Sequence, residues 1–237
     1  MNFNVFNNPD VVNIFTDGSM YMNTHTRETI GCAGALIVDS NKVTTKYTQI
    51  LRDSTNNECE IYSIILGIDA AARRGLFNGT NTINLFSDSQ ICIKGLKEWS
   101  FKWITNIRDG RLISSSGMEV ANQELFAYLM TNIVNNNLRI NFYHQKGHIN
   151  PSSRKDIDKA SRVFSISNYC KLIEIDRRFI QEIAYYNDMV DLFTKAELDS
   201  RRCNGEFDTK VTKGYYPFNI DLSTLDISKY STLIGRR

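Results

Sequence analysis

Residues 11–19 read VVNIFTDGS, a run of apolar and β-branched residues that ends in an acid, a glycine and a serine. Such a run favours a buried strand, and the Asp-Gly-Ser that follows it favours a turn. We therefore predict a strand over 11–16 that enters a turn at Asp17. An aspartate at such a junction is most often a turn or capping residue, but it is also where a strand can present a carboxylate to a site.

The flanking sequence predicts a mixed α/β layout around this strand. Residues 31–38 and 42–51 are separated by Asp39-Ser40-Asn41, which predicts two antiparallel strands. Further along the chain, the patterns predict a helix over 57–74 ended by Gly75, a strand over 82–87, a helix from about Ser89, a helix over 120–134 and a strand over 138–143. This order indicates an antiparallel hairpin beside parallel strands, with helices flanking one sheet.

The composition is that of an ordinary globular protein. The chain has 237 residues, of which 42% are hydrophobic and 23% charged, and its formal net charge is +2. These values exclude general disorder and a globally basic nucleic-acid coat. No run approaches the roughly 18 apolar residues of a membrane span, and residues 1–4 lack the pattern of a signal peptide. We expect a cytoplasmic protein without a membrane partner, and reduced, buried thiols at Cys32, Cys59, Cys92, Cys170 and Cys203.

Three acids occupy positions that suggest chemistry. Asp17 and Asp88 each follow an apolar strand, and Glu60 lies in the first turn of an apolar helix. Singly, each has an ordinary explanation as a turn, a cap or a partner of the helix dipole. Together they would gather carboxylates at the carboxyl edge of the sheet, where sites in open α/β folds lie. Such clusters are tolerated chiefly when hard divalent cations bind between them, so the set predicts a two-metal site for phosphodiester hydrolysis.

Five short motifs follow one another in the chain: IFTDGS at 14–19, TNNECE at 55–60, FSDSQ at 86–90, KGH at 146–148 and NDMVD at 187–191. In this order they resemble type 1 ribonuclease H, over residues 11–149 and 187–198. The resemblance implies a ribonuclease H-like fold with a mixed five-stranded sheet. It also implies an endonuclease that hydrolyses the RNA strand of RNA–DNA hybrids and leaves 5′-phosphate and 3′-hydroxyl ends.

The resemblance implies a ligand set for two Mg²⁺ ions, with Mn²⁺ as a possible substitute. The ligands are Asp17, Glu60, Asp88 and Asp191. Asp191 is preferred to Asp188 because of the Asn-x-x-x-Asp spacing of the last motif. His148 is implied to assist proton transfer or product release.

Substrate contacts are implied in the same way. The residues matched to contacts with the RNA strand, through its minor groove and 2′-hydroxyls, are Gly18, Ser19, Asn56, Asn57 and Gln90. Thr55 and Asn122 match a pocket for a phosphate of the DNA strand, where Asp53 departs from an Arg found in some members. The segment 94–111 matches a basic protrusion along the DNA strand, with Lys94, Lys97 and Lys102 as phosphate contacts. Asn187 completes the predicted contacts. Of Trp99 and Trp103 in this segment, at least one is expected to pack inward.

Two segments do not fit the resemblance. Residues 150–186 form an insertion before the last motif, within a catalytic domain over 1–200, and residues 201–237 form a C-terminal extension. The insertion is either a helical lid or hairpin that lengthens the helix carrying Asp191, or an element that grips substrate or a partner. We expect a monomer. The alternative functions are a DNA-directed nuclease of the same superfold and a non-catalytic hybrid-binding protein.

Overall fold

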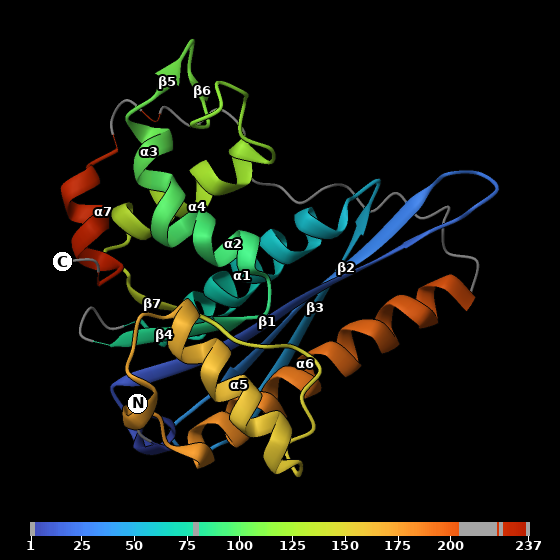
Figure 1. The fold of residues 1–237 in the computed structure, drawn as a ribbon. Helices are drawn as coiled ribbons and strands as arrows, with labels where there is room; N and C mark the ends of the chain where they lie inside the picture. Colours follow the sequence, from blue (N-terminus) through green and yellow to red (C-terminus); the bar gives the residue numbers. More distant parts are fainter. Residues whose placement is uncertain (1–2, 78–80, 204–221, 223–224, 236–237) are drawn as a thin grey trace.

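The central feature of the computed structural model is a five-stranded mixed sheet in the order β3-β2-β1-β4-β7. The structure describes residues 3–77, 81–203, 222 and 225–235 (Figure 1). The strands are β1 (Val11–Met22), β2 (Thr29–Val38), β3 (Thr44–Arg52), β4 (Thr82–Ser87) and β7 (Arg139–His144). β1, β2 and β3 pair antiparallel, whereas β4 runs parallel to both β1 and β7. The predicted mixed five-stranded sheet is confirmed.

The predicted end of the first strand is wrong. β1 does not turn at Asp17 but continues to Met22, because β2 is long enough to pair with it as far as Met22 and Thr29. The parallel pairing with β4 does end early, at Thr16 and Ser87. Asp17 is therefore the first residue of β1 beyond the end of β4, which leaves its side chain at the carboxyl edge of the parallel strands.

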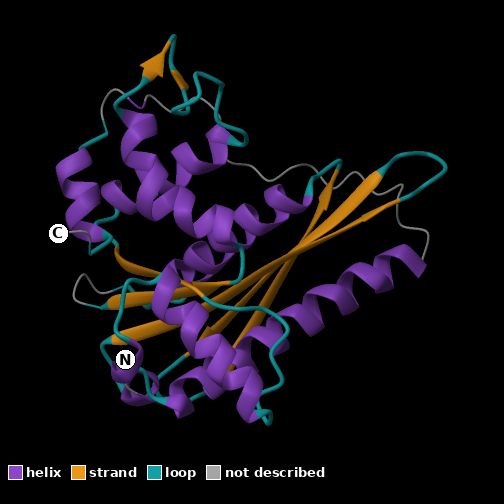
Figure 2. Ribbon diagram, viewed as in Figure 1, coloured by secondary structure: helices purple, strands orange, loops and turns teal. Residues whose placement is uncertain are grey.

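Helices cover both faces of the sheet (Figures 1 and 2). Neighbouring residues Ile14 and Phe15 of β1 point to opposite faces and belong to two different apolar clusters. On the Ile14 face pack α1 (Asn56–Arg73) and α4 (Gln123–Asn135). The Phe15 face is covered by α5 (Arg154–Ser167) and α6 (Arg177–Cys203).

The local sequence explains how α1 begins and ends. Thr55 Oγ1 accepts a hydrogen bond from Glu58 N, and Glu58 Oε2 accepts one from Thr55 N, which together form a capping box. At the other end, Gly75 has a φ of +68° and directly follows the C-cap Arg74. The positive φ ends the helix at little cost because glycine has no β-carbon.

The predicted basic protrusion is a bent helical segment. It comprises α2 (Gln90–Lys94), a π-helical turn over Gly95–Trp99 and α3 (Ser100–Ile104). A small hairpin, β5 (Ile107–Arg108) with β6 (Arg111–Leu112), follows it. Trp103 is buried against Phe126 and Trp99 is 37% exposed, as expected for a pair of which at least one packs inward.

The segment 150–186 is helical and extends the layer on the Phe15 face. It forms α5, a 3₁₀ turn over Leu172–Glu174 and the first ten residues of α6, which then continues through the last motif without a break. Phe164 of α5 and Phe179 of α6 lie edge to face, and Phe179 also packs on Phe86 of β4. The helix that carries Asp191 is therefore anchored to the sheet by aromatic packing at Phe179, about three turns before that residue.

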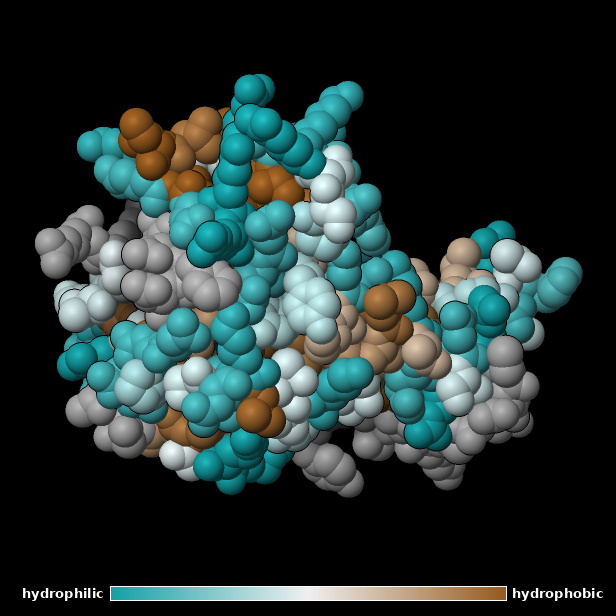
Figure 3. All heavy atoms as spheres, turned by 90° about the horizontal axis from the view of Figure 1, so that it is seen from below, coloured by the Kyte–Doolittle hydropathy of each residue, from teal (hydrophilic) through white to brown (hydrophobic). Residues whose placement is uncertain are grey.

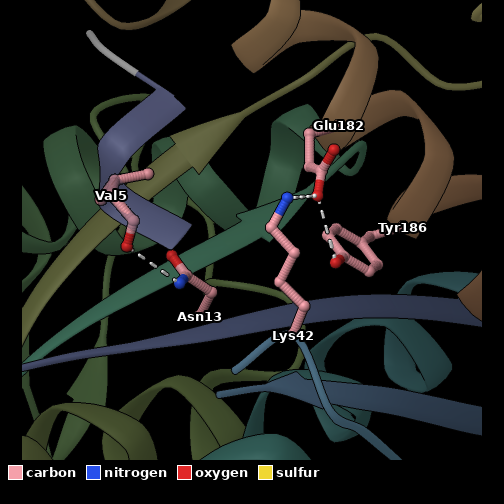
Figure 4. A network of polar contacts seen from close by, with 5 residues as sticks. All are labelled: Val5, Asn13, Lys42, Glu182 and Tyr186. Carbon is pink, nitrogen blue, oxygen red and sulfur yellow. Dashed lines mark hydrogen bonds and ion pairs between the residues drawn. The ribbon is translucent and has the colours of Figure 1, made fainter. Parts of the chain in front are cut away.

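Polar contacts join the start of α6 and the N-terminus to the sheet (Figure 4). Lys42, between β2 and β3, forms an ion pair of 2.9 Å with Glu182, which also accepts a hydrogen bond from Tyr186. Asn13 of β1 donates to the carbonyl of Val5 in the 3₁₀ turn Phe3–Asn7.

The tail is described only in part. Residues 204–221 of the predicted C-terminal extension lie outside the described residues. α7 (Ile227–Leu233) packs against α4, with Tyr230 fully buried and its hydroxyl donating to the carbonyl of Leu96 at 2.8 Å. Of the cysteines, Cys32, Cys59 and Cys92 are free and buried as predicted, whereas free Cys170 is partly exposed and the side chain of Cys203 lies outside the described set.

Gly34 of β2 allows the close approach of α6, and this predicts a specific mutational effect. A β-carbon at this position would overlap Thr194 Oγ1. We expect Gly34→Ala to lower the free energy of unfolding by about 1–3 kcal/mol, the usual range for an overpacked contact. Thr194→Ala makes room for the methyl group, so the double variant should recover part of the loss in a urea unfolding experiment. A double variant no more stable than Gly34→Ala alone would contradict this account.

Candidate active site

Three carboxylates from distant parts of the chain meet at the carboxyl edge of the sheet. Asp17 comes from β1, Asp88 follows the last residue of β4, and Glu60 is the fifth residue of α1, just past the first turn in which it was predicted. One oxygen of each side chain lies within 4.8 Å of the corresponding oxygens of the other two. Asp17 and Glu60 are only 6% and 7% exposed. The three acids singled out by sequence are thus brought together.

Two glycines make the close approach possible. A β-carbon on Gly18 would overlap the backbone of Cys59 and Glu60, so only glycine lets α1 approach β1 closely enough to bring Glu60 beside Asp17. A β-carbon on Gly147 would overlap the carboxylate of Asp88. The glycines of the first and fourth motifs therefore have a steric role in forming the site.

Burial and mutual repulsion destabilise the charged forms of the three carboxylates. Burial, followed by the charges of Asp88 and Asp191, raises the pKa of Asp17 to about 8. Burial, then the charge of Asp17, raises the pKa of Glu60 well above its ordinary value, and burial also raises the pKa of Asp88. Within the described residues, the buried oxygens Asp17 Oδ2 and Glu60 Oε2 have no hydrogen-bond partner. Buried, mutually repelling oxygen donors without partners are the set that a hard divalent cation satisfies, so these residues fit Mg²⁺ or Mn²⁺.

A fourth acid, Asp191, lies on α6 near this group but is not among the acids whose oxygens lie within 4.8 Å of one another. Its charge raises the pKa values of Asp17, Glu60 and Asp88. One turn further along α6, Lys195 forms an ion pair of 2.7 Å with Asp191. Lys195 was not predicted from the sequence, although its spacing of four residues from Asp191 on a helix was a usable signal.

Asn187 and Gln145 form a hydrogen-bonded chain that leads to Asp88. Asn187 donates to the Asp88 carboxylate, and its own Oδ1 accepts from Gln145 Nε2 at 2.6 Å. Both residues are buried, at 3% and 2% exposure. Because Gln145 holds the oxygen of the Asn187 amide, the amide nitrogen is the atom turned towards Asp88. Gln145 was not predicted, and its position directly before the KGH motif was the only signal.

Two histidines lie beside Asp88. The predicted His148 is exposed, has a φ of +53°, and its charge lowers the pKa values of Asp88 and Asp188. His144, which was not predicted, lies 3.2 Å from the carbonyl of Asp88 through Nε2 and 2.9 Å from Ser167 Oγ through Nδ1. His144 thereby connects the end of α5 to the site.

The other predicted contact residues are distributed around this edge. Thr55 caps α1, and the next two residues, Asn56 and Asn57, are exposed in its first turn. Gln90 is exposed at the start of α2, and Asn122 is left-handed, with a φ of +56°, before α4. Ser19 lies two residues after Asp17 in β1 and is partly exposed.

The three predicted lysines of the protrusion differ in exposure. Lys102 is exposed and Lys94 is partly exposed. Lys97 is partly buried, its Nζ lies 5.9 Å from the ring centre of Tyr169, and burial lowers its pKa. Lys102 is therefore the lysine best exposed to contact a phosphate group.

Comparison with known sequences identifies the family. A sequence model described as RNase H matches residues 9–163, which is more than half of the chain and contains Asp17, Glu60 and Asp88. The chain belongs to the RNase H family. The predicted resemblance to type 1 ribonuclease H is confirmed. This member of the RNase H family is a ribonuclease H enzyme.

Individual relatives agree with the family match. A ribonuclease H of Thermoanaerobacter sp. (strain X514) is 32% identical over 143 residues, which cover 60% of this chain and 81% of that protein. A ribonuclease HI of Haemophilus influenzae is 30% identical over 157 residues, which cover 65% of this chain and 89% of that protein. Among solved structures, LC11-RNase H1, isolated from compost by a metagenomic approach, aligns with a TM-score of 0.42 and 16% identity over 68% of this chain and 96% of that one.

The family match ends inside α5 and does not reach Asp191. The match contains another helical acid, Asp158, but its carboxylate forms an ion pair of 2.9 Å with Arg177. Asp158 is not among the main causes that shift the pKa values of Asp17, Glu60 or Asp88, whereas Asp191 is among them for all three. Of these two helical acids, only Asp191 on α6 influences the three carboxylates electrostatically. Among the described helices, none is both long and apolar enough to span a membrane.

Proposed function

We propose that this RNase H family enzyme hydrolyses the RNA strand of RNA–DNA hybrids, with divalent metal ions held by Asp17, Glu60, Asp88 and Asp191. The observation that carries the proposal is the buried group of three carboxylates with unpartnered oxygens in a chain of this family. The curated relatives named ribonuclease H and HI support the substrate class.

The side chains have distinct proposed roles. Two Mg²⁺ ions bound by the four carboxylates would activate a water molecule for attack on the scissile phosphate and stabilise the leaving oxygen. Asn187, oriented by Gln145, holds the Asp88 carboxylate in position through a hydrogen bond. Lys195 holds Asp191 at the edge of the site. His148, exposed on its loop, moves a proton at the leaving oxygen or assists release of the product.

Selection of the RNA strand is proposed to depend on residues at the mouth of the site. Gly18, Ser19, Asn56, Asn57 and Gln90 would contact the 2′-hydroxyls, which distinguish RNA from DNA. Thr55, Asn122 and Lys102 would contact phosphates of the DNA strand. We further propose that residues 1–200 are the catalytic unit, that residues 201–237 extend it, and that the protein acts as a monomer.

A substrate series tests this function. We expect cleavage of a uniform RNA–DNA hybrid in the presence of Mg²⁺ or Mn²⁺, and roughly a hundredfold slower cleavage of RNA duplex and DNA duplex of the same sequence. A DNA duplex lacks the 2′-hydroxyls that the RNA-strand contacts need, and an RNA duplex lacks the DNA strand that the predicted phosphate contacts need. Preferential cleavage of DNA duplex would instead support a DNA-directed nuclease. Hybrid binding without cleavage in either metal would support the non-catalytic alternative.

A further inference from the structure

The outer side of α5 carries a row of basic residues that no role in the catalytic site explains. Lys155, Lys159 and Arg162 are all exposed, and their spacing of four and then three residues puts them on one face of the helix. We call these three residues the basic stripe. With Arg154 they line an open depression of about 870 Å³ along α5, which is also lined by the acids Asp156 and Asp158 and by the apolar side chains of Val163 and Ile166.

The acids of α5 do not cancel this charge. Asp158 is engaged by Arg177 at 2.9 Å, and Asp156 lies in the first turn, where a negative charge complements the helix dipole. The opposite face of the helix is apolar and buried through Ile157, Ala160 and Phe164. The basic stripe is therefore a positively charged surface held in a fixed orientation by the packing beneath it.

The end of α5 is tied directly to the catalytic edge. Asn168 donates to the carbonyl of His144 at 2.7 Å and accepts from His144 N at 3.0 Å, and the His144 ring contacts the carbonyl of Asp88. At 1.5 Å per residue, the stripe begins roughly 9 Å from Asn168 at Arg162 and ends roughly 20 Å away at Lys155. These distances correspond to about three to six base pairs of a duplex, at roughly 3.4 Å per base pair. In Figure 1, α5 lies below α2. The end of α5 is held beside the end of β4 by His144, which contacts Ser167 and the carbonyl of Asp88.

We propose that the basic stripe binds the sugar-phosphate backbone of the duplex a few base pairs away from the scissile phosphate. The inference rests on the proposed function and adds a second contact surface to it. Charge complementarity favours a nucleic acid as the occupant, because phosphates repeat along a duplex as cations repeat along the stripe. The face seen from below carries both hydrophilic and apolar residues (Figure 3). In the depression itself four basic residues face two acids and two apolar residues, an excess of positive charge that favours an anionic occupant.

The test uses two hybrids in which a short RNA segment lies near one end or the other, so that the duplex extends past the cleavage site in only one direction. The variant is Lys159→Ala/Arg162→Ala. The control is Arg73→Ala/Arg139→Ala, which removes two exposed charges from the end of α1 and the start of β7, at the opposite edge of the sheet. The melting temperature of each variant, and the conservative variant Lys159→Arg/Arg162→Lys, control for folding.

We expect the stripe variant to raise KM roughly tenfold for one of the two hybrids, with kcat unchanged, and the conservative variant to restore KM. The slope of log(1/KM) against log[salt] should become shallower by about one to two units for the same hybrid. A KM equal to that of the control variant on both hybrids overturns the inference, and an acidic protein then becomes the better occupant. Absence of cleavage by the wild-type enzyme on both hybrids would instead count against the proposed function, so the two failures are distinguishable.

Discussion

Cleavage of an RNA–DNA hybrid is expected to fall at least a hundredfold in an Asp191→Asn variant and to stay within about twofold of wild type in Asp158→Asn. Both substitutions remove one negative charge from a helical aspartate, so they form a matched pair. The family match covers Asp158 and ends before Asp191. The structure gives the opposite ranking, because Asp191 acts on the pKa values of all three other acids, whereas Asp158 pairs with Arg177.

The measurement is a single-turnover cleavage rate with saturating enzyme, first in Mg²⁺ and then in Mn²⁺. Single-turnover conditions separate the chemical step from product release. Calorimetric titration of metal into the same variants gives a second readout, in which Asp191→Asn should weaken binding and Asp158→Asn should not. If Asp158→Asn were the inactive variant, α5 rather than α6 would carry the fourth ligand and the assignment of α6 would be wrong.

The second large effect concerns stability without metal. We expect Asp17→Asn to abolish cleavage and, in the presence of a chelator at pH 7.5, to make the protein more stable than wild type. The reason is the raised pKa of Asp17, about 8 in the folded protein against 3.8 for the free group. The folded state binds this proton more tightly than the unfolded state, so the free energy of unfolding falls as pH rises from about 4 to about 8.

Asparagine keeps the shape of the side chain and removes this cost. One unit of pKa shift corresponds to about 1.36 kcal/mol. We expect a gain of about 2–3 kcal/mol at pH 7.5, which raises the melting temperature by about 4–12 °C. The check is a set of melting curves from pH 5 to pH 8.5 in chelator. The gain should shrink towards pH 5, where wild-type Asp17 keeps its proton.

Added Mg²⁺ should have the reverse effect. It is expected to stabilise the wild-type protein by binding the folded state and to have little effect on Asp17→Asn. Asp53→Asn is the control, because Asp53 is an exposed acid in the loop after β3. Its substitution removes a carboxylate charge that is not buried, so it should not raise the free energy of unfolding in the same way. An Asp17→Asn variant less stable than wild type across the whole pH range in chelator would contradict the electrostatic account.

Local patterns were sufficient to predict most of the sheet and three of the acids. β-branched runs predicted strands, and the acids that followed them were correctly expected to meet. The end of β1 could not be predicted, because Asp-Gly-Ser is a common turn sequence and only pairing with β2 keeps it extended. Gly18 and Gly147 belong to the sequence motifs, but their steric role depends on Glu60 and Asp88, which pack against them only in the folded protein.

Contacts between distant segments could not be read from the chain. Gln145 and His144 are unremarkable in sequence, and they matter because Asn187, Ser167 and the end of β4 are folded against them. Lys97 was predicted as a phosphate contact because its segment is basic and matches the family's basic protrusion, whereas its contact with the ring of Tyr169 depends on the tertiary structure. Such contacts are set by the order of strands and the packing of helices, which no local window contains.

The sequence by itself determined the α/β class, the mixed sheet and the positions of Asp17, Glu60 and Asp88, because strand periodicity is local and the carboxyl ends of parallel strands share one edge. Its last motif also named Asp191. Only the tertiary structure decided that α6 places this acid near enough to raise the pKa values of the other three, while Asp158 of α5 is held in an ion pair with Arg177. The physical reason is packing. Aromatic residues of α5 and α6 pack on the Phe15 face of the sheet, and the missing β-carbon of Gly34 leaves room for Thr194 of α6.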